Sequence, residues 1–362
     1  MSKRWIAPAA AVMLTLAPAA GPAQPRLTFT RMFDNVRIRF LSTQLAVEGR
    51  GEWGFSGVVE ADDARLLFDT GNLPDTATAN AKVLKVSLTG IRDVVLSHWH
   101  GDHTGGLASA LTAIGESGAT IYAHPAIFDE KFARAGRPAL SERSESKGAQ
   151  VNGLRDRRAA IEAQHGTFDL SATPREIRPG FALTGTVPRP RARDQKLPDG
   201  NLMRQNGALV VDTVPDEQSL VINTRDGLVI VTGCGHAGVV NTIDHVRHLF
   251  PDRPVAAVIG GFHWFASPDA DVVDAANELR VMGVARLMGA HCTLVEPIFT
   301  LRQHGWTRES AAIGAVGTDF LLRRPASSAT LNPMLPSSVT AREVTVRSPN
   351  AAPTSSNCHP AN

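Results

Sequence analysis

The segment VVLSHWHGDHTGGL at residues 94–107 concentrates side chains that bind metals. It carries His98, His100, Asp102 and His103, and so holds three of the 12 histidines of the chain. Imidazole nitrogens and carboxylate oxygens are ligands of zinc at about 2.0–2.2 Å, and they also suit iron and manganese. A single histidine here would fit a solvated polar loop, but four such groups directly after an apolar strand predict a metal site.

The neighbouring residues predict how these side chains are positioned. DVVLS at 93–97 is apolar and predicts a buried strand, whose carboxyl end delivers the histidines to the edge of a sheet. Gly105 and Gly106 permit the tight turn into a helix predicted at 107–117, and a second strand follows at 120–124. Alternating strands and helices predict a layered α/β fold, in which polar strand ends meet at one edge.

The chain then repeats this plan. An opening hairpin at 55–71 precedes a predicted helix at 81–88, and a later hairpin at 218–234 precedes a predicted helix at 238–250. The strands PVAAVIGGFH and VARLMGAH each end on a histidine, and a helix predicted at 269–283 joins them. RLLFDTG in the first half corresponds to LVIVTGC in the second, and VVLSHWH corresponds to AVIGGFH. We therefore expect two similar halves, each a sheet with helices on its outer face.

The expected folded domain extends from residue 27 to residue 324, and 362 residues are enough for one large domain with a sizeable core. Within it, residues 136–206 are rich in Arg, Pro and Ser with weak periodicity, and predict an insertion of short strands and long loops that lies as a lid over the site. The tail at 325–362 is rich in Ser, Pro and Asn, and is expected to be disordered because it cannot bury enough apolar surface.

The composition limits the classes of partner. Hydrophobic residues make up 43% of the chain and charged residues 20%, as in ordinary globular proteins, and the net charge is +2. Because no basic stripe or aromatic-interleaved basic patch occurs, we expect a small-molecule substrate rather than nucleic acid. No pattern indicates an oligomeric state.

The N-terminus has the pattern of a secretory signal peptide at residues 1–23. Lys3 and Arg4 precede an Ala-rich apolar run that ends in small residues. The run is too short to span a bilayer, so no membrane span is expected after the signal is removed. We therefore expect a periplasmic or secreted protein.

The H-x-H-x-D-H segment resembles the hallmark of the metallo-β-lactamase superfamily, and the resemblance covers most of residues 45–322. It implies an αββα sandwich of two pseudo-symmetric halves. The chain also resembles one branch of this superfamily, which is named for 7,8-dihydropterin-6-methyl-4-(β-D-ribofuranosyl)-aminobenzene-5'-phosphate synthase. Phrases typical of this branch occur in the same order here: SHWHGDHTGGL, LTGTVPR, TGCGHAGVVNTI, IGGFHW and AHCT. Many members of this branch are described only as metal-dependent hydrolases, so the resemblance is specific for the branch and weak for any substrate.

The resemblance also implies a set of ligands. In the superfamily the first two histidines of the motif hold one metal, while the Asp and the third histidine hold a second. This implies one ion at His98 and His100 and another at Asp102 and His103. The histidine that follows a late strand in the superfamily corresponds to His291 in LMGAHCT, for which a strand-capping role is the alternative.

Two positions depart from the superfamily pattern. Where the family has GHTPGS before a strand, this chain has VPDEQSL, and where the family usually has a bridging Asp, it has TGCGH. Cys234 can replace the Asp as a thiolate ligand, since zinc accepts sulfur, or it can be a small buried packing residue. His236 can supply the missing imidazole, and Asp216 or Glu217 is a weaker candidate for that ligand.

Four further residues are expected to support the site. His263 in GGFHW lines the pocket as a proton donor or a substrate contact, and His124 in YAHP caps a strand. Asp69 hydrogen-bonds to the histidine loop, because ligand imidazoles usually need such a partner. Arg189 in TGTVPRP holds a substrate phosphate, with a solvated loop arginine as the alternative.

Together these residues predict a metal-dependent hydrolase. One or two Zn²⁺ ions, or iron or manganese, would lower the pKa of a bound water and supply hydroxide to an ester, lactone, amide or phosphoester. Asp102 would orient the water and His263 would protonate the leaving group. One alternative is a transferase like the synthase, which condenses at a ribosyl phosphate and releases pyrophosphate, although an export signal disfavours that cytoplasmic biosynthesis. The other is a non-enzymatic metal-binding module.

Overall fold

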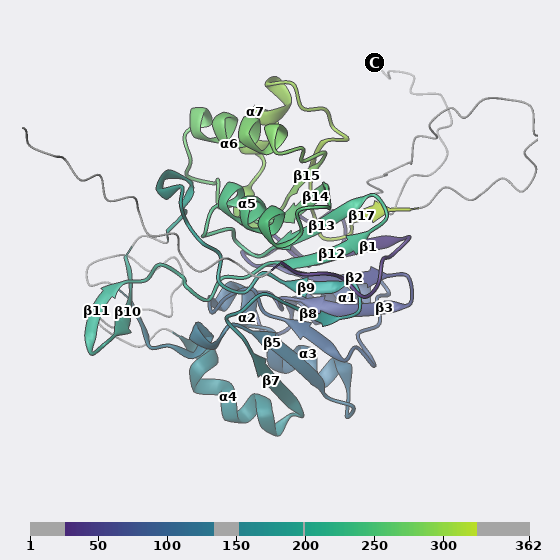
Figure 1. The fold of residues 1–362 in the computed structure, drawn as a ribbon. Coiled ribbons are helices and arrows are strands. Elements are labelled where there is room, and N and C mark those ends of the chain that lie inside the picture. The colour runs from purple at the N-terminus through teal and green to yellow at the C-terminus, as the bar shows by residue number, and fades with distance from the viewer. Residues whose placement is uncertain (1–25, 134–151, 198–199, 324–362) are drawn as a thin grey trace, which may run out of the picture.

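Two seven-stranded sheets form the centre of the protein in the computed structural model, which describes residues 26–133, 152–197 and 200–323 (Figure 1). The predicted signal peptide at 1–23 and the predicted tail at 325–362 lie outside these ranges. The first sheet has the strand order β17 (Asp319–Leu322), β1 (Val36–Ser42), β2 (Ser56–Ala61), β3 (Ala64–Phe68), β4 (Asp93–Val95), β5 (Ala119–Ala123) and β7 (Gly166–Leu170).

The second sheet stacks against the first, and a three-stranded sheet projects from one side (Figure 1). The order in the second sheet is β16 (Ala311–Ile313), β15 (Leu287–Gly289), β14 (Val255–Gly260), β13 (Gly227–Thr232), β12 (Leu220–Thr224), β9 (Phe181–Leu183) and β8 (Arg175–Arg178). The projecting sheet consists of β11 (Ala208–Val211), β10 (Asn201–Gln205) and β6 (Lys131–Ala133).

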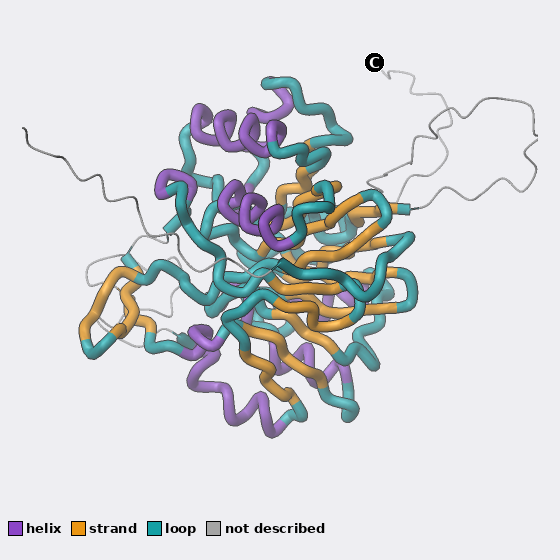
Figure 2. The backbone as a smooth tube through the Cα atoms, in the orientation of Figure 1, coloured by secondary structure: helices purple, strands orange, loops and turns teal. Residues whose placement is uncertain are grey.

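Helices cover the outer faces of both sheets (Figure 2). The first sheet carries α1 (Thr76–Val83), α3 (Leu107–Ile114) and α4 (Gly153–Ala163), and the second carries α5 (Val239–Leu249), α6 (Asp269–Val281) and α7 (Glu296–Gln303). The short elements are α2 (Gly101–Thr104), η1 (Pro125–Phe128), η2 (Ala192–Asp194) and η3 (His291–Thr293).

Three clusters of buried side chains hold these layers together. The central cluster lies between the sheets and includes Phe40, Phe68, Ile222 and Ile259. The outer clusters lie between each sheet and its helices, where α3 buries a stripe of apolar side chains at helical spacing. Because both faces of β13 and β14 are covered, every residue of these strands is buried. This layering confirms the predicted αββα sandwich.

The two halves follow the repeated plan that the sequence predicts. β2 and β3 pair antiparallel and β3, β4 and β5 run parallel, while β12 and β13 pair antiparallel and β13, β14 and β15 run parallel. The carboxyl ends of the parallel strands of each half lie at one edge of its sheet. The polar segments that follow β3, β4, β13, β14 and β15 meet there, as the contacts below show.

The helix predicted at 81–88 is displaced in the structure. α1 spans Thr76–Val83, and Lys85 adopts a φ of 55°, which ends the helix. The helix is anchored by Asn80, whose side chain donates to the carbonyl oxygens of Leu41 and Arg50 at 2.8 Å each. This polar anchor, rather than the apolar residues after Val83, determines the position of the helix.

Residues 136–206 contain more regular structure than expected, within the part described. α4 has only two buried side chains, Leu154 and Ile161, in an Arg-rich segment, so its apolar pattern is too sparse to predict a helix. β7 extends the first sheet, and β8 and β9 extend the second, so these strands belong to the sandwich rather than to a separate lid. None of the helices in the described ranges combines the length and apolar character that a bilayer span needs.

Candidate metal centre

The candidate ligands lie on segments that follow strands of both sheets: His98 and His100 after β4, Asp102 and His103 on α2, Cys234 and His236 after β13, and His291 after β15. These segments approach one another closely. A Cβ atom on Gly233 would lie 2.1 Å from Ser97 Oγ, so only glycine fits where the β13 segment crosses the β4 segment.

The first group of ligands joins the two halves through His98, His100 and His236. His98 Nε2 lies 2.9 Å from His100 Nδ1, and His236 Nε2 lies 3.3 Å from the same nitrogen. One ligand atom each of His98, Cys234 and His236 lies within 4.8 Å of the other two. His236 thus lies close enough to His98 and His100 to supply a third imidazole to this group.

The second group consists of Asp102, His103, Cys234 and His291, whose ligand atoms also lie within 4.8 Å of one another. His103 Nε2 lies 3.1 Å from Cys234 Sγ and 3.2 Å from His291 Nε2. Asp102 Oδ2 lies 3.3 Å from His291 Nε2. Cys234 belongs to both groups, so its sulfur lies where a bridging ligand would be needed.

Asp69 determines which nitrogen carries the proton in two of these imidazoles. Its carboxylate accepts hydrogen bonds from Ser97 N, Ser97 Oγ and His103 Nδ1, each at 2.7 Å. Because His103 donates from Nδ1, its neutral ring has an unprotonated Nε2, whose lone pair is directed at Cys234 Sγ. The Ser97 hydroxyl proton points to Asp69, so this hydroxyl accepts from His98 Nδ1 at 2.9 Å and leaves His98 Nε2 unprotonated. Asp69 thus has the geometry expected of it.

The same holds for His236, whose Nδ1 donates to the carbonyl oxygen of Lys196 at 2.6 Å. His98, His103 and His236 therefore direct Nε2 lone pairs toward the space that the Cys234 sulfur and the Asp102 carboxylate face. A divalent cation in this space would accept electron pairs from all of these groups once the Cys234 thiol has lost its proton. Nitrogen, oxygen and sulfur donors in this arrangement fit one or two divalent metal ions.

The electrostatics of the centre agree with this donor set. Burial, reinforced by the neighbouring imidazoles, holds the pKa of His98 and of His100 well below its usual value, so both are neutral near pH 7, the form that binds metals. Burial alone would raise the pKa of Asp102, but the imidazoles of His103 and His291 outweigh it and hold this pKa well below its usual range. Near pH 7 His98 and His100 are therefore neutral and Asp102 is a carboxylate. Burial alone would lower the pKa of His291, but Cys292 and the Asp102 carboxylate outweigh it and raise this pKa to about 10, so His291 must lose a proton to bind a metal.

The weaker ligand candidates, Asp216 and Glu217, bind backbone amides instead. Asp216 Oδ2 accepts from Trp99 N at 2.6 Å, and Glu217 accepts from His236 N at 2.6 Å and from Ala237 N. Neither carboxylate belongs to the two ligand groups found in the described residues. They hold the loops that carry the ligands, and so support the centre without facing it.

A buried ionic network fixes the backbone between His98 and His100. Lys131 is fully buried, and its Nζ lies 2.9 Å from Asp212 Oδ1. The Trp99 indole donates to Asp212 Oδ2 at 3.0 Å. No sequence pattern indicates this network, because Lys131 and Asp212 are 81 positions apart. The supporting role of Ser97, by contrast, can be inferred from the sequence, because this residue lies at a predicted strand end directly beside His98.

His263 lies against the centre, with its ring centroid 4.4 Å from that of His236. Burial lowers the pKa of His263 to about 4, so at neutral pH it is an uncharged imidazole. This favours a hydrogen-bonding contact with substrate over proton donation from an imidazolium. His124 caps η1, since its Nδ1 accepts from Ala126 N at 3.1 Å, in line with the capping role expected for it.

Arg189 supports a loop rather than facing the ligands. Its guanidinium donates to the carbonyl oxygens of Thr213 and Val214, the latter at 2.7 Å. Val214 has a φ of 51°, which β-branched residues rarely adopt. Asp212 Oδ1 accepts from Val214 N at 2.9 Å, so Arg189 and Asp212 together hold this strained segment in place.

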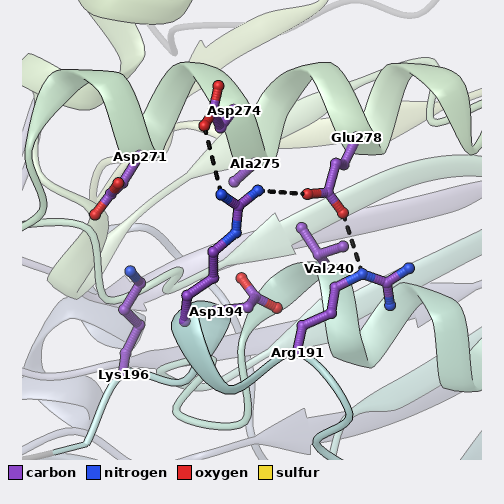
Figure 3. A pocket seen from close by; sticks show the side chains of 9 residues that line it. Arg191, Asp194, Lys196, Val240, Asp271, Asp274, Ala275 and Glu278 are labelled. Atoms are coloured by element: carbon purple, nitrogen blue, oxygen red, sulfur yellow. Dashed lines mark hydrogen bonds and ion pairs between the residues drawn. The ribbon is translucent and has the colours of Figure 1, made fainter.

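A charged pocket lies between η2 and α6 (Figure 3). Arg191 and Arg193 are paired with Glu278 of α6 at 3.1 and 3.0 Å. Lys196 also lines this pocket, and its backbone carbonyl accepts the hydrogen bond from His236. The ion pairs of Arg191 and Arg193 connect this stretch of chain to α6 and balance the charge of both arginines.

If each ligand group holds its own metal ion, substitutions in the two groups should remove different ions. We expect His98→Ala to remove the ion of the first group and Asp102→Ala to remove the ion of the second, because each deletes one donor of its group and ligand sets act together. Metal analysis of the purified variants measures this, with the exposed His165→Ala as the control. Full metal content in both variants would contradict the assignment.

The ligand role of Cys234 can be tested by replacing its soft sulfur atom with the harder oxygen atoms of Asp or Ser. If its sulfur is a ligand, Cys234→Asp should keep metal and shift preference toward iron or manganese, and Cys234→Ser should weaken binding while the fold stays intact. Burial raises the pKa of the Cys234 thiol, so a purely packing cysteine would leave Cys234→Asp with a buried, uncompensated charge. A destabilised Asp variant beside a fully metallated Ser variant, by metal content and thermal unfolding, would exclude the ligand role.

Glu217 should act on metal binding through His236. Glu217→Ala leaves the buried N–H groups of His236 and Ala237 without their acceptor, which should cost about 1–3 kcal/mol of unfolding free energy. Metal affinity should fall by about 10–100-fold, as for other groups that orient a ligand. Metal titration and chemical denaturation test this against the exposed control Glu116→Ala. Unchanged affinity and stability would show that the His236 loop does not need Glu217.

Comparison with known proteins agrees with this geometry. The chain matches the family model of the metallo-β-lactamase superfamily over residues 52–248. It is 32% identical over 269 residues to the 7,8-dihydropterin-6-methyl-4-(β-D-ribofuranosyl)-aminobenzene-5'-phosphate synthase of Methanocaldococcus jannaschii, a match that covers 72% of this chain and 88% of that protein. An uncharacterized protein of the same organism is 26% identical over 250 residues, which cover 69% of this chain and 87% of that protein.

A solved structure shows the same fold. The crystal structure of a metal-dependent hydrolase of the β-lactamase superfamily superposes with a TM-score of 0.61 and 24% identity, and covers 78% of this chain and 98% of that one. The resemblance drawn from the histidine motif is thus confirmed for the superfamily and for the synthase-like branch. The chain belongs to the metallo-β-lactamase superfamily.

Proposed function

We propose that this protein is a metal-dependent hydrolase acting on an ester, lactone, amide or phosphoester. The observation that carries the proposal is the convergence of unprotonated imidazole nitrogens with the Cys234 sulfur and the Asp102 carboxylate. Zn²⁺ is the metal we propose, held by His98, His100 and His236 in one group and by Asp102, His103 and His291 in the other, with Cys234 shared. When bound, it supplies Lewis acidity to the substrate oxygen and to water.

The residues of the chain have distinct parts in this reaction. Asp102 is ionised, and its side chain is 18% exposed, so it can accept a hydrogen bond from the attacking water and orient it. The water oxygen bonds to the carbonyl carbon or phosphorus, the bond to the leaving group breaks, and the leaving group takes the proton that the water releases. His263, neutral and beside His236, hydrogen-bonds to the substrate as the bond breaks.

A second candidate is a transferase like the relative from M. jannaschii. It is favoured by 32% identity over 88% of that protein, whose name describes a synthase. We further propose that the N-terminal 23 residues direct export, on the basis of Lys3, Arg4 and the apolar run that follows. Export to the periplasm would favour the hydrolase over a biosynthetic role in the cytoplasm.

The hydrolase proposal predicts metal-dependent turnover of simple esters. Zinc-loaded protein should hydrolyse p-nitrophenyl acetate or bis(p-nitrophenyl) phosphate, with loss of activity on chelation and recovery on adding Zn²⁺. His98→Ala should lower the rate by more than about 100-fold, and His165→Ala should leave it unchanged. Pyrophosphate release from 7,8-dihydropterin-6-methyl diphosphate in the presence of 4-(β-D-ribofuranosyl)-aminobenzene-5'-phosphate, without ester or phosphodiester hydrolysis, would instead support the transferase. No reaction in either assay would leave the metal-binding module as the better description.

A further inference from the structure

Two large aromatic side chains remain exposed directly beside the ligand groups. Trp53 is 41% exposed and Phe265 is 43% exposed. The Trp53 ring centroid lies 5.4 Å from that of His291, and the Phe265 centroid lies 4.9 Å from that of His263. Both rings therefore contact the metal centre while part of their surface remains in water.

These rings lie beside the partly exposed residues of the centre. His98, His103, His236 and His291 are at most 1% exposed, whereas His100, His263 and the Asp102 side chain are partly exposed. Because Trp53 and Phe265 are packed against His291 and His263, they border this open side. Asp102 Oδ2 lies 3.3 Å from His291 Nε2, so the Trp53 ring that packs on His291 is close to this carboxylate.

The two rings form a corner that is already in place. Their centroids are 5.6 Å apart and their planes meet at 89°. The segments that carry them are held by hydrogen bonds, since Phe55 N donates to the Asp102 carbonyl at 3.0 Å and Phe265 N donates to the Cys292 carbonyl at 3.1 Å. A perpendicular pair can receive a flat ring with its face against one partner and its edge against the other, which are the two favourable aromatic geometries.

We propose that Trp53 and Phe265 bind a planar aromatic or heteroaromatic group of the substrate, next to the bond that is broken at the metal centre. The inference rests on the proposed hydrolase function, and it specifies the substrate class. Exposed aromatic surface at a functional mouth is stabilised when a ligand covers it, and a flat ring covers this corner better than a puckered ring of equal size.

The test compares two esters with the same reacting group. Methyl phenylacetate and methyl cyclohexylacetate share the acyl carbon and the leaving group, and differ in whether the ring is planar. We expect zinc-loaded protein to prefer the phenyl ester in kcat/KM by about tenfold, Trp53→Ala to abolish the preference, and Trp53→Phe to retain most of it. Phe265→Ala should weaken the preference. Phe299→Ala, an exposed Phe on α7, should not change it.

Binding is measured separately from turnover, so that the two proposals can fail independently. In calorimetric titrations phenylacetate should bind more tightly than cyclohexylacetate, and Trp53→Ala should remove the difference. If neither ester is hydrolysed but this binding preference is found, the aromatic site stands and the hydrolase proposal fails for these esters. If both esters are hydrolysed equally well, or Trp53→Ala slows both to the same extent, the aromatic site is refuted and the hydrolase proposal stands.

Discussion

The hydrogen bonds of the Asp69 carboxylate are the contact on which the metal centre depends. Asp69 follows β3, and Ser97 follows the parallel neighbour β4, so the sheet brings them together. The Asp69 carboxylate accepts from the Ser97 hydroxyl and from His103 Nδ1, and the Ser97 hydroxyl in turn accepts from His98 Nδ1. One buried carboxylate therefore determines the tautomers of both imidazoles. Asp69 itself adopts a φ of 52°, a conformation that costs about 1–3 kcal/mol in most residues and persists where surrounding contacts compensate it.

The 212–218 loop, which precedes β12, ties the ligand segments of the two halves to each other. Asp216 holds the β4 segment through Trp99 N, and Glu217 holds the β13 segment through His236 N. Gln218 adds a backbone bond to Ser97 O at 2.9 Å. The superfamily pattern would place a histidine ligand near this loop. Here the loop carries carboxylates that orient the candidate ligand segments, and the His236 imidazole lies 3.3 Å from His100 Nδ1.

The candidate centre has a buried side and a partly exposed side. The imidazoles of His98, His103, His236 and His291 are at most 1% exposed. Asp102, His100 and His263 reach the open side, and Trp53 and Phe265 border it. Polar and aromatic side chains therefore lie next to each other on the partly exposed side, an arrangement that is usual for small-molecule sites.

The sequence by itself determined the sandwich, the histidine motif, and His236 and His291 as neighbours of that motif, since strand periodicity and strand-end residues are local patterns. The tertiary structure alone decided the roles of Asp216, Glu217 and Arg189, which proved to support loops, and the presence of α4 and of the Lys131–Asp212 pair. Trp99 and Asp216 are 117 positions apart, and hydrogen bonds across such separations leave no periodic trace in the sequence. Only packing of the two sheets brings these groups within hydrogen-bonding distance, and this is why their functions could not be predicted from the sequence.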